Sequence, residues 1–335
     1  MIEVTFRAVA EDQPGAVLRA QFERTWASYR HWYLRDGEAA RPSFVRCRRM
    51  LREHLPELLP TWERLVELVG GGDLEARFLS LYNPPAFVAG CTQALWTHRT
   101  PALVRNYDYA PSLFDGLILR SALNRTGVVA MADCIWGVLD GINEHGLAVS
   151  LAYGGRQPVG DGFAITVVLR YILEFCAEVA EAVAVLKRVP IHVGYNVALI
   201  DRRGRHATVF VAPDRPARVE PWLVSANRQA QDGRPDEPSV QDSALREAVV
   251  QARLSDPGSG LGQVIDGFLA EPVWRDPVRH GWGTLYTACY LPAEAAVSLR
   301  WRGSEWRQAV DTFEVGQRTI EFRGGKPHKA CVHAH

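Results

Sequence analysis

Residues 90–109 read GCTQALWTHRTPALVRNYDY, and at this stretch the character of the chain changes. Before it, from about Gly15 to Val69, apolar residues recur at spacings of three and four among Arg and Glu, which predicts helices divided by Pro56 and Pro60. After it, Val, Leu, Ile and aromatic residues form short runs bounded by Gly, Asn and Asp, which predicts strands joined by tight turns. A helical beginning is therefore followed by a strand-rich remainder.

The pattern beyond this junction predicts a layered α+β arrangement, because strands alternate with an amphipathic segment. A single long helix is expected over Ile165–Val189, ended by Pro190, and another helix near Asp242 after an exposed loop over Gln229–Gln241. Strands are expected at Ala102–Tyr109, Gly127–Leu139, Gly146–Tyr153, Asn196–Ile200, Ala207–Val211, Thr284–Leu291 and Ala296–Trp301, with Asp140–Gly146 as a hairpin connection and a further apolar run over Thr312–Phe322.

Composition and charge narrow the classes of partner. The 335 residues hold 38 basic and 38 acidic side chains, so no overall field attracts nucleic acid or an anionic membrane surface. No run approaches the roughly 20 apolar residues of a membrane span, and the N-terminus lacks the features of a signal peptide. We therefore expect a cytoplasmic protein with a small-molecule partner. The six cysteines show no paired spacing typical of a metal or redox site, and no cofactor or metal is expected.

Cys91 differs from the other cysteines in its neighbours. A thiol is an efficient nucleophile only as a thiolate, so it needs a nearby base. A cysteine at a chain terminus supplies that base through its own α-amine, which here requires cleavage of the Gly90–Cys91 bond. Gly90 leaves its carbonyl open to attack and tolerates a strained backbone. The competing interpretation of Cys91 is a buried apolar residue.

The strand predicted at Leu103–Tyr109 carries charges in its middle. Alternation places Arg105 on one face and Asp108 on the other. Charges within such a run are costly unless they are paired or functional. Either a structural ion pair or a catalytic role is consistent with this pattern.

These motifs together resemble the choloylglycine hydrolase and isopenicillin N acyltransferase superfamily, within the N-terminal nucleophile hydrolases. Proteins of that family begin their mature chain with Cys-Thr, followed by a strand containing Arg-Asn-aromatic-Asp and then by Asn-Glu-Lys/His-Gly-Leu. The corresponding segments are Cys91-Thr92, Arg105-Asn106-Tyr107-Asp108 and Asn143-Glu144-His145-Gly146-Leu147. The resemblance extends over most of Cys91 to Leu291. Two departures are the long segment that precedes Cys91 and Gln93, which has no assignment.

The resemblance implies roles for six residues. Cys91 would attack an amide carbonyl, Arg105 would lie beside the thiol and orient Asp108, and Asp108 would hold the α-amine or a substrate amine. A backbone N–H at or near Tyr153 and the side chain of Asn227 would stabilise the oxyanion, and Arg246 would bring a second guanidinium to the site. Each has a plainer alternative, because Tyr153 also fits a core aromatic, Asn227 a turn residue and Arg246 a solvated helix position.

The resemblance also implies a fold and a function. The fold would be a four-layer αββα sandwich, with residues 1–90 as a helical propeptide or small subunit and residues 91–335 as the catalytic core, together forming one structural domain. The chain would cleave itself between Gly90 and Cys91 and then hydrolyse or transfer the acyl group of a small N-acyl amide, with a thioester as one conceivable acyl donor. The oligomeric state is open, a homo-oligomer included.

Three alternatives stay open at this point. A papain-like cysteine hydrolase would use His98, His145 or His192 and would need no cleavage. A non-catalytic binding protein would keep the same fold with Cys91 merely buried. A metal protein would use the tail histidines, His328, His333 and His335.

Overall fold

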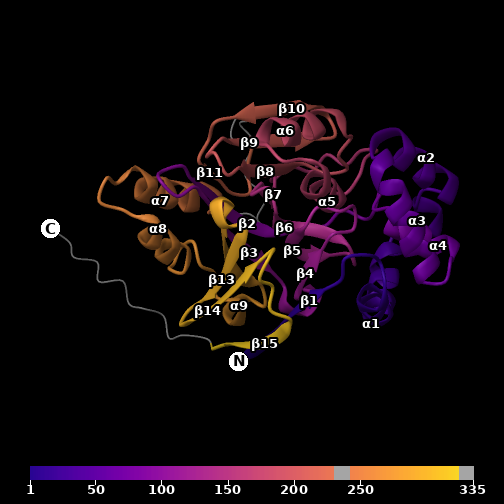
Figure 1. Cartoon of the computed structure of the whole chain (residues 1–335), viewed down its shortest axis with the longest axis horizontal. Coiled ribbons are helices and arrows are strands. Elements are labelled where there is room, and N and C mark those ends of the chain that lie inside the picture. Colours follow the sequence, from indigo (N-terminus) through magenta and orange to yellow (C-terminus); the bar gives the residue numbers. More distant parts are fainter. Residues whose placement is uncertain (230–241, 324–335) are drawn as a thin grey trace.

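The computed structural model describes residues 1–229 and 242–323. Within them, two β-sheets pack face to face between layers of helices (Figure 1), so the predicted α+β fold with an αββα sandwich is confirmed. The loop predicted over Gln229–Gln241 lies almost entirely outside the described residues. The tail histidines His328, His333 and His335 lie outside them as well.

The larger sheet has nine strands and is mainly antiparallel. Its order is β10 (Arg215–Glu220), β9 (His206–Ala212), β8 (Tyr195–Ile200), β7 (Ala148–Tyr153), β6 (Gly137–Asn143), β5 (Val128–Asp133), β4 (Leu117–Ser121), β1 (Ile2–Ala10) and β15 (Gly316–Phe322). The parallel pairing of β1 with β4 is the exception.

The smaller sheet has six strands and carries the Gly90–Tyr109 region. Its order is β11 (Val224–Ser225), β2 (Gly90–Trp96), β3 (Ala102–Tyr109), β12 (Gly283–Leu291), β13 (Ala296–Trp301) and β14 (Ser304–Ala309). The strands β3 and β13 have the bounds predicted from the sequence. The strands β4, β10 and β14 were not predicted.

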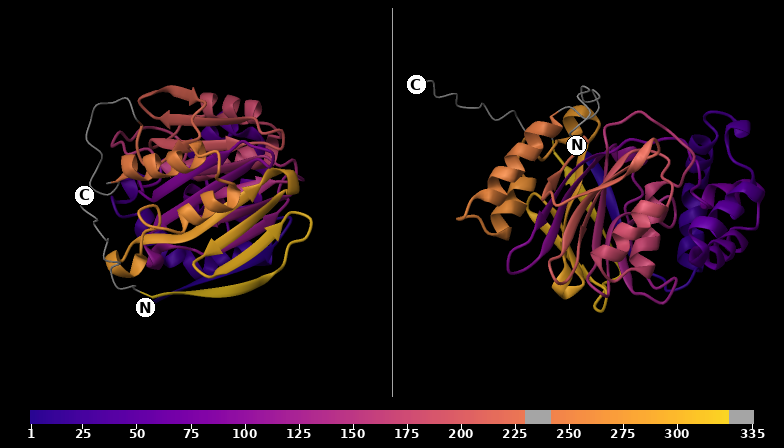
Figure 2. Two further views of the ribbon diagram at one scale, coloured as in Figure 1. Left: turned by 90° about the vertical axis from the view of Figure 1, so that its left-hand side faces the viewer. Right: turned by 90° about the horizontal axis from the view of Figure 1, so that it is seen from above.

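Helices cover the outer face of each sheet (Figure 2). Those over the nine-stranded sheet are α5 (Ile165–Phe175) and α6 (Val179–Arg188), and those over the six-stranded sheet are α7 (Ser243–Ser255) and α8 (Leu261–Phe268). The N-terminal helices, which lie beside α5 in Figure 1, are α1 (Ala16–Tyr33), α2 (Phe44–His54), α3 (Leu59–Leu68) and α4 (Asp73–Leu79), and α9 (Pro277–His280) precedes β12. No helix within the described residues has the length and apolar character needed to cross a membrane.

Both faces of the six-stranded sheet are buried, and alternation along β2 and β3 divides their side chains between two cores. Leu95 and Tyr107 belong to the large core between the sheets, whereas Ala94 and Val104 pack with Phe268 of α8 in a second core. Because both faces of this sheet are covered, every residue of β2 is buried. Polar residues in these strands must therefore find partners inside the protein.

The N-terminal segment is not wholly helical, contrary to the sequence prediction for residues 1–90. It begins with β1, which pairs with β4 on one side and with β15 on the other. The alternating pattern of Ile2–Ala10, with Val4, Phe6 and Ala8 buried, is the signal that the prediction missed. The segment is thus part of the large sheet.

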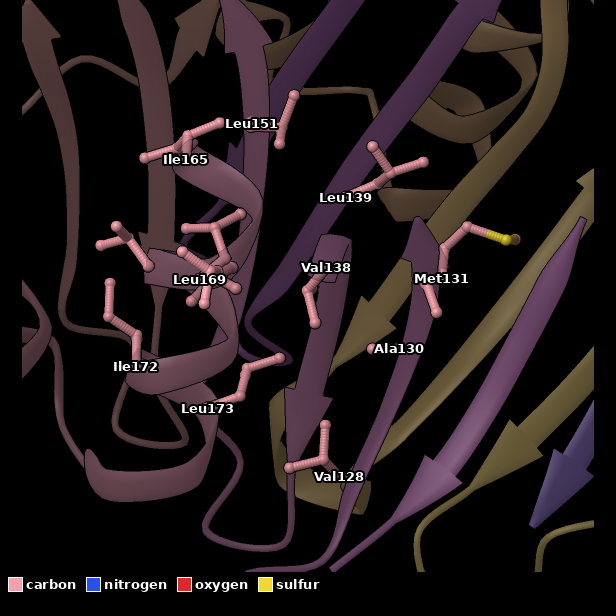
Figure 3. Packing of buried hydrophobic residues seen from close by; sticks show 14 of the residues in the cluster. Val128, Ala130, Met131, Val138, Leu139, Leu151, Ile165, Leu169, Ile172 and Leu173 are labelled. Atoms are coloured by element: carbon pink, nitrogen blue, oxygen red, sulfur yellow. The ribbon is translucent and has the colours of Figure 1, made fainter. Parts of the chain in front are cut away.

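The single helix predicted over Ile165–Val189 is also wrong, because the structure has two helices. Cys176 leaves α5 in an extended conformation, and Glu178 begins α6 with a capping box formed with Glu181. The apolar stripe continues across the break, so periodicity alone does not reveal it. Leu169 and Leu173 of α5 lie against β6 in Figure 3.

The strand predicted over Gly127–Leu139 is two strands, β5 and β6. The turn between them holds Cys134 and Ile135, both with positive φ, which β-branched residues rarely adopt. The connection predicted at Asp140–Gly146 is correspondingly shorter, because Asp140 to Asn143 belong to β6.

Candidate active site

The register of β2 against β3 determines which side chains meet. Cys91 lies opposite Tyr107, and Gln93 lies opposite Arg105. These side chains point between the two sheets, whereas those of Thr92 and Asp108 point toward α7 and α8. The backbones of Cys91 and Asp108 are therefore close, because β2 and β3 are paired, but their side chains lie on opposite faces of the sheet.

The Cys91 thiol is fully buried beside a guanidinium group. Arg105 Nη2 lies 3.1 Å from Cys91 Sγ. Burial raises the pKa of the Cys91 thiol to about 11, although the positive charge of Arg105 opposes this shift. In the uncut chain the thiol is therefore protonated at neutral pH, and nucleophilic attack requires a base.

The carboxylate partner of Arg105 is Asp140 of β6, not Asp108. Arg105 Nη1 donates to Asp140 and, at 3.0 Å, to the Tyr286 hydroxyl. The hydroxyls of Tyr286 and Tyr290 in turn donate to Asp140. The prediction that Arg105 orients Asp108, and the alternative that the two form an ion pair, are both wrong because the side chains lie on opposite faces of β3.

Asp108 lies on the other face, opposite Gly90 in the neighbouring strand. Its Oδ1 accepts a hydrogen bond from Thr284 Oγ1 at 2.7 Å, and its Oδ2 lies 3.9 Å from Arg275 Nε. Oδ2 has no hydrogen bond among the described residues. Burial raises the pKa of Asp108, and the nearby Arg246 guanidinium opposes the shift. The carboxylate thus has one oxygen available to a further donor.

Gly90 opens β2, and the strained backbone expected there is not seen because its φ is not positive. The reason for glycine is steric. A Cβ atom on Gly90 would lie 2.6 Å from the Trp282 ring and 3.0 Å from Asp108 Cβ. Any side chain at this position would displace either the Trp282 ring or the backbone next to the Gly90–Cys91 bond.

Asn227, which follows β11, contacts both sides of that bond. Its Oδ1 accepts from the Cys91 N–H at 2.9 Å, and its Nδ2 donates to the carbonyls of Ala89 at 3.2 Å and Tyr153 at 3.1 Å. Asn227 is thus a buried part of the site rather than an exposed turn residue. Tyr153 reaches Asn227 through its carbonyl oxygen, and its hydroxyl donates to the Arg156 carbonyl.

Arg246 enters the site from α7 and is fully buried, which excludes a solvated helix position. Its Nη1 donates to the Cys91 carbonyl at 2.6 Å and to Thr92 Oγ1 at 2.5 Å. Its Nη2 donates to Asn227 Oδ1 at 3.0 Å. Arg246 therefore positions both the Cys91 backbone and the Asn227 amide.

Two polar residues of the site had no predicted role. Gln93 donates to the Asn196 carbonyl and to Ser225 Oγ, and it accepts from Ser150, so it joins β2 to β11 in its own sheet and to β7 and β8 in the facing sheet. Asp140 was read as part of a turn. A charge within the apolar run of β5 and β6 is the same signal that singled out Arg105, and it was available in the sequence.

The histidines proposed for a papain-like site lie elsewhere. His98 and His145 are exposed, and His192 contacts the Gly160 carbonyl. Among the described residues, the side chains that hydrogen-bond Cys91 are those of Arg105, Asn227 and Arg246. This arrangement gives the papain-like alternative no base.

Comparisons with known proteins point to the same superfamily. Residues 96–249 match the model of the family described as acyl-coenzyme A:6-aminopenicillanic acid acyl-transferase. The match begins after Cys91 and does not include the Gly90–Cys91 bond. No curated protein sequence matches the chain.

Three solved structures are similar to the chain at low identity. A variant of conjugated bile acid hydrolase from Clostridium perfringens is 13% identical with a TM-score of 0.46, over 70% of this chain and 97% of that one. Penicillin V acylase from Agrobacterium tumefaciens is 15% identical with a TM-score of 0.46, over 68% and 90%. The Caenorhabditis elegans ortholog of N-acylethanolamine-hydrolyzing acid amidase is 17% identical with a TM-score of 0.43, over 61% and 93%.

The family match confirms the resemblance drawn from the Arg-Asn-aromatic-Asp and Asn-Glu-His-Gly-Leu segments, both of which lie inside it. Residues 96–249, just under half of the chain, therefore match the acyl-coenzyme A:6-aminopenicillanic acid acyl-transferase family of N-terminal nucleophile enzymes.

Proposed function

We propose that the chain cleaves its own Gly90–Cys91 bond and then uses Cys91 as the nucleophile of an amidohydrolase or acyltransferase. The observation that carries this proposal is the convergence on one residue of three groups from distant parts of the chain. Arg105 contacts the Cys91 thiol, Asn227 its nitrogen and Arg246 its carbonyl. A merely buried cysteine needs none of these partners.

In the cleavage step, the Cys91 thiol adds to the Gly90 carbonyl carbon and gives up its proton. The Cys91 nitrogen takes up a proton and leaves, so that the Gly90 acyl group becomes a thioester on Sγ. Water then hydrolyses this thioester, which releases the Gly90 carboxylate and regenerates the thiol beside a free α-amine. The Asn227 contact to the Cys91 nitrogen holds the leaving atom in place.

In each turnover, the α-amine accepts the thiol proton and the thiolate attacks the substrate amide carbonyl. Asn227 Nδ2 and a backbone N–H near Tyr153 donate to the resulting oxyanion. Asn227 Nδ2 becomes available for this once the Ala89 carbonyl moves away after cleavage. The α-ammonium returns a proton to the departing amine, and water or a second amine then attacks the acyl-Cys91 thioester.

Asp108 holds the new α-amine in this proposal. Its Oδ2 has no hydrogen bond among the described residues, and Asp108 lies opposite Gly90, one residue from the atom that becomes the amine. After cleavage, a charge-assisted hydrogen bond from the α-ammonium would give Asp108 Oδ2 the donor that it lacks in the uncut chain. The substrate is a small N-acyl amide, with hydrolysis and acyl transfer sharing one intermediate.

Mass spectrometry of the purified protein tests the cleavage. We expect the wild type to yield fragments of residues 1–90 and 91–335, the second beginning at Cys91, and Cys91→Ala to remain one chain of 37.3 kDa. Cys289→Ala is the matched control, because Cys289 is equally buried in the same sheet but faces the other core. An uncut wild type, or cleavage of the Cys91→Ala chain, would refute the proposal.

A further inference from the structure

A cavity of about 430 Å³ lies between the N-terminal segment and the rest of the chain, a size typical of sites for small ligands. From the N-terminal side it is lined by β1, α1 and Phe87, and from the other side by the end of β3, the segment that follows it and the turn after β5. Both sides of the Gly90–Cys91 bond thus contribute to its wall.

The cavity adjoins the Cys91 site. Tyr107, directly opposite Cys91, packs against Tyr109 and Phe114 with ring centroids 5.6 and 5.8 Å apart. Tyr109 and Phe114 both line the cavity. The Tyr107 ring therefore lies between the cavity and the position of Cys91 in β2.

The wall is largely aromatic but contains a carboxyl pair. Rings of Tyr29, Trp32, Phe87, Tyr109 and Phe114 line the cavity, each partly exposed. Asp115 and Asp133 also line it and are likewise partly exposed, although both lie deep in the protein. Aromatic faces combined with carboxylates are a typical environment for organic cations.

The side-chain hydrogen bonds to the pair come from neutral donors. The Tyr29 hydroxyl oxygen lies 2.7 Å from Asp115 Oδ2 and 3.1 Å from Asp133 Oδ1, and it accepts from the Cys134 N–H at 2.9 Å. A hydroxyl has one proton to donate, so it cannot serve both carboxylates at once. The further donors are neutral as well, since the Cys134 thiol lies 3.6 Å from Asp133 Oδ2 and the Gln21 side chain hydrogen-bonds Asp115. A bound cation would add a positive charge between the two carboxylates.

Two positive groups also line the cavity on the Asp115 side. The charge of Arg24 acts on Asp115 and opposes the effect of burial on the pKa of that carboxyl, and Arg24 Nη2 donates to Gln21. Arg7 Nη2 donates to the backbone carbonyl of Asp115 at 2.8 Å. Burial raises the pKa of Asp133 to about 7, and the charge of Asp115 adds to this shift. A bound cation would reverse the shift and leave both carboxylates ionised.

We propose that this cavity binds a small molecule with a protonated primary amine on an aromatic or apolar body, and that Asp115 and Asp133 hold the ammonium group. Because the cavity adjoins Cys91, we assign the bound amine as part of the substrate that Cys91 acts on, and this assignment rests on the proposed function. Binding of the amine to the cavity is independent of the proposed function, because the cavity is present in the uncut chain.

Calorimetric titration of the full-length Cys91→Ala chain tests the inference without any need for activity. The probes are 2-phenylethylamine, its neutral analogue 2-phenylethanol and the anion 3-phenylpropionate. We expect the amine to bind at least about tenfold more tightly than the alcohol, and Asp133→Asn or Asp115→Asn to remove this difference while leaving alcohol binding within about twofold. Asp311→Asn, an exposed position, should change nothing.

The pH dependence supplies a second readout. Since Asp133 must be ionised to hold the ammonium, amine affinity should rise between pH 6 and 8, and Asp133→Asn should abolish this rise. The other ionisable groups that line the cavity are Glu3, Arg7, Arg24, Tyr29, Tyr109 and Cys134, and Tyr107 and Tyr195 also interact with the Asp133 charge.

Equal binding of alcohol and amine, tighter binding of the anion, or a flat pH profile would overturn the inference. Cleavage of the wild type at Cys91 would be unaffected by any of these outcomes, so failure of the inference is distinguishable from failure of the proposed function. If Asp133→Asn does not fold, as judged by thermal unfolding, Asp115→Asn carries the same comparison.

Discussion

At the scale of single residues, Gly90 and Cys91 owe their character to neighbours from distant parts of the sequence. Trp282 occupies the space that a side chain at position 90 would need. Arg105 approaches the Cys91 thiol, yet burial outweighs its charge and keeps the pKa of the thiol at about 11. In the cleavage step the thiol proton is balanced by protonation of the departing Cys91 nitrogen. In each later turnover on a substrate, the α-amine that cleavage has created serves as the base for the thiol.

Substitution of Gly90 tests the steric part of this account. We expect Gly90→Ala to slow self-cleavage about a hundredfold, because a Cβ 2.6 Å from the Trp282 ring shifts the scissile bond, and a displacement on the order of 1 Å has that effect on rate. Gly90→Ala combined with Trp282→Ala should recover much of the loss. The rate is followed by gel electrophoresis of freshly expressed protein.

Gly262→Ala is the matched control, since nothing lies within 4 Å of a Cβ at that position. Normal cleavage of the Gly90→Ala variant would show that the contact with Trp282 does not hold the scissile bond.

At the scale of elements, Asp140 joins the two sheets at the site. It projects from β6 of the nine-stranded sheet and contacts Arg105 of β3 and two tyrosines of β12, all in the six-stranded sheet. Asp140 and Arg105 are fully buried, so each depends on the other to offset the loss of hydration. This pair keeps the guanidinium against the Cys91 thiol.

Removal of the Asp140 charge should therefore destabilise the whole fold. We expect Asp140→Asn, made in the uncleaved Cys91→Ala chain, to lower the free energy of unfolding by about 3 kcal/mol, because Arg105 loses its buried counter-charge. Urea denaturation measures the change. Glu23→Gln, which breaks the exposed pair with Arg19, should cost less than about 1 kcal/mol, and an equally small effect at Asp140 would contradict the structural role assigned to the pair.

At the scale of the whole molecule, the segment before Cys91 is built into the fold. β1 lies inside the nine-stranded sheet between β4 and β15, and Trp62, Phe78 and Leu79 from the N-terminal helices are buried in the main core. Hydrogen bonds also cross the boundary, from Trp136 to the Leu79 carbonyl and from Tyr171 to Glu57. We therefore propose that residues 1–90 and 91–335 remain one structural domain after cleavage.

Size-exclusion chromatography of the cleaved protein tests this proposal. The two fragments should elute together in buffer and separate only in denaturant, because separation would expose both neighbours of β1 and the apolar core beneath α1–α4. Elution of residues 1–90 alone would assign the segment as a released propeptide. Refolding from denaturant into the same complex would strengthen the proposal.

The local character of most elements follows from the pattern of the amino-acid sequence. Periodicity located β3, β7, β13 and α7 closely, since side-chain alternation is a property of the strand itself. The prediction missed β1, although its alternating pattern is present in the sequence. It also missed the break between α5 and α6, because the apolar stripe continues across the capping box that begins α6. The family resemblance named Cys91, Arg105, Asp108, Asn227 and Arg246, and their catalytic roles stay predictions.

Which of these residues come into contact depends on how the two sheets and their helices pack. The sequence cannot show that Arg105 pairs with Asp140 rather than Asp108, because the partner comes from a different sheet and the pairing depends on which faces are buried. It cannot show that Asn227 contacts Ala89, Cys91 and Tyr153 at once, or that α1 contributes to a cavity beside the nucleophile. The physical reason is common to all three, since alternation and helical period are set by neighbours in the chain, whereas contacts between elements are set by how the sheets pack.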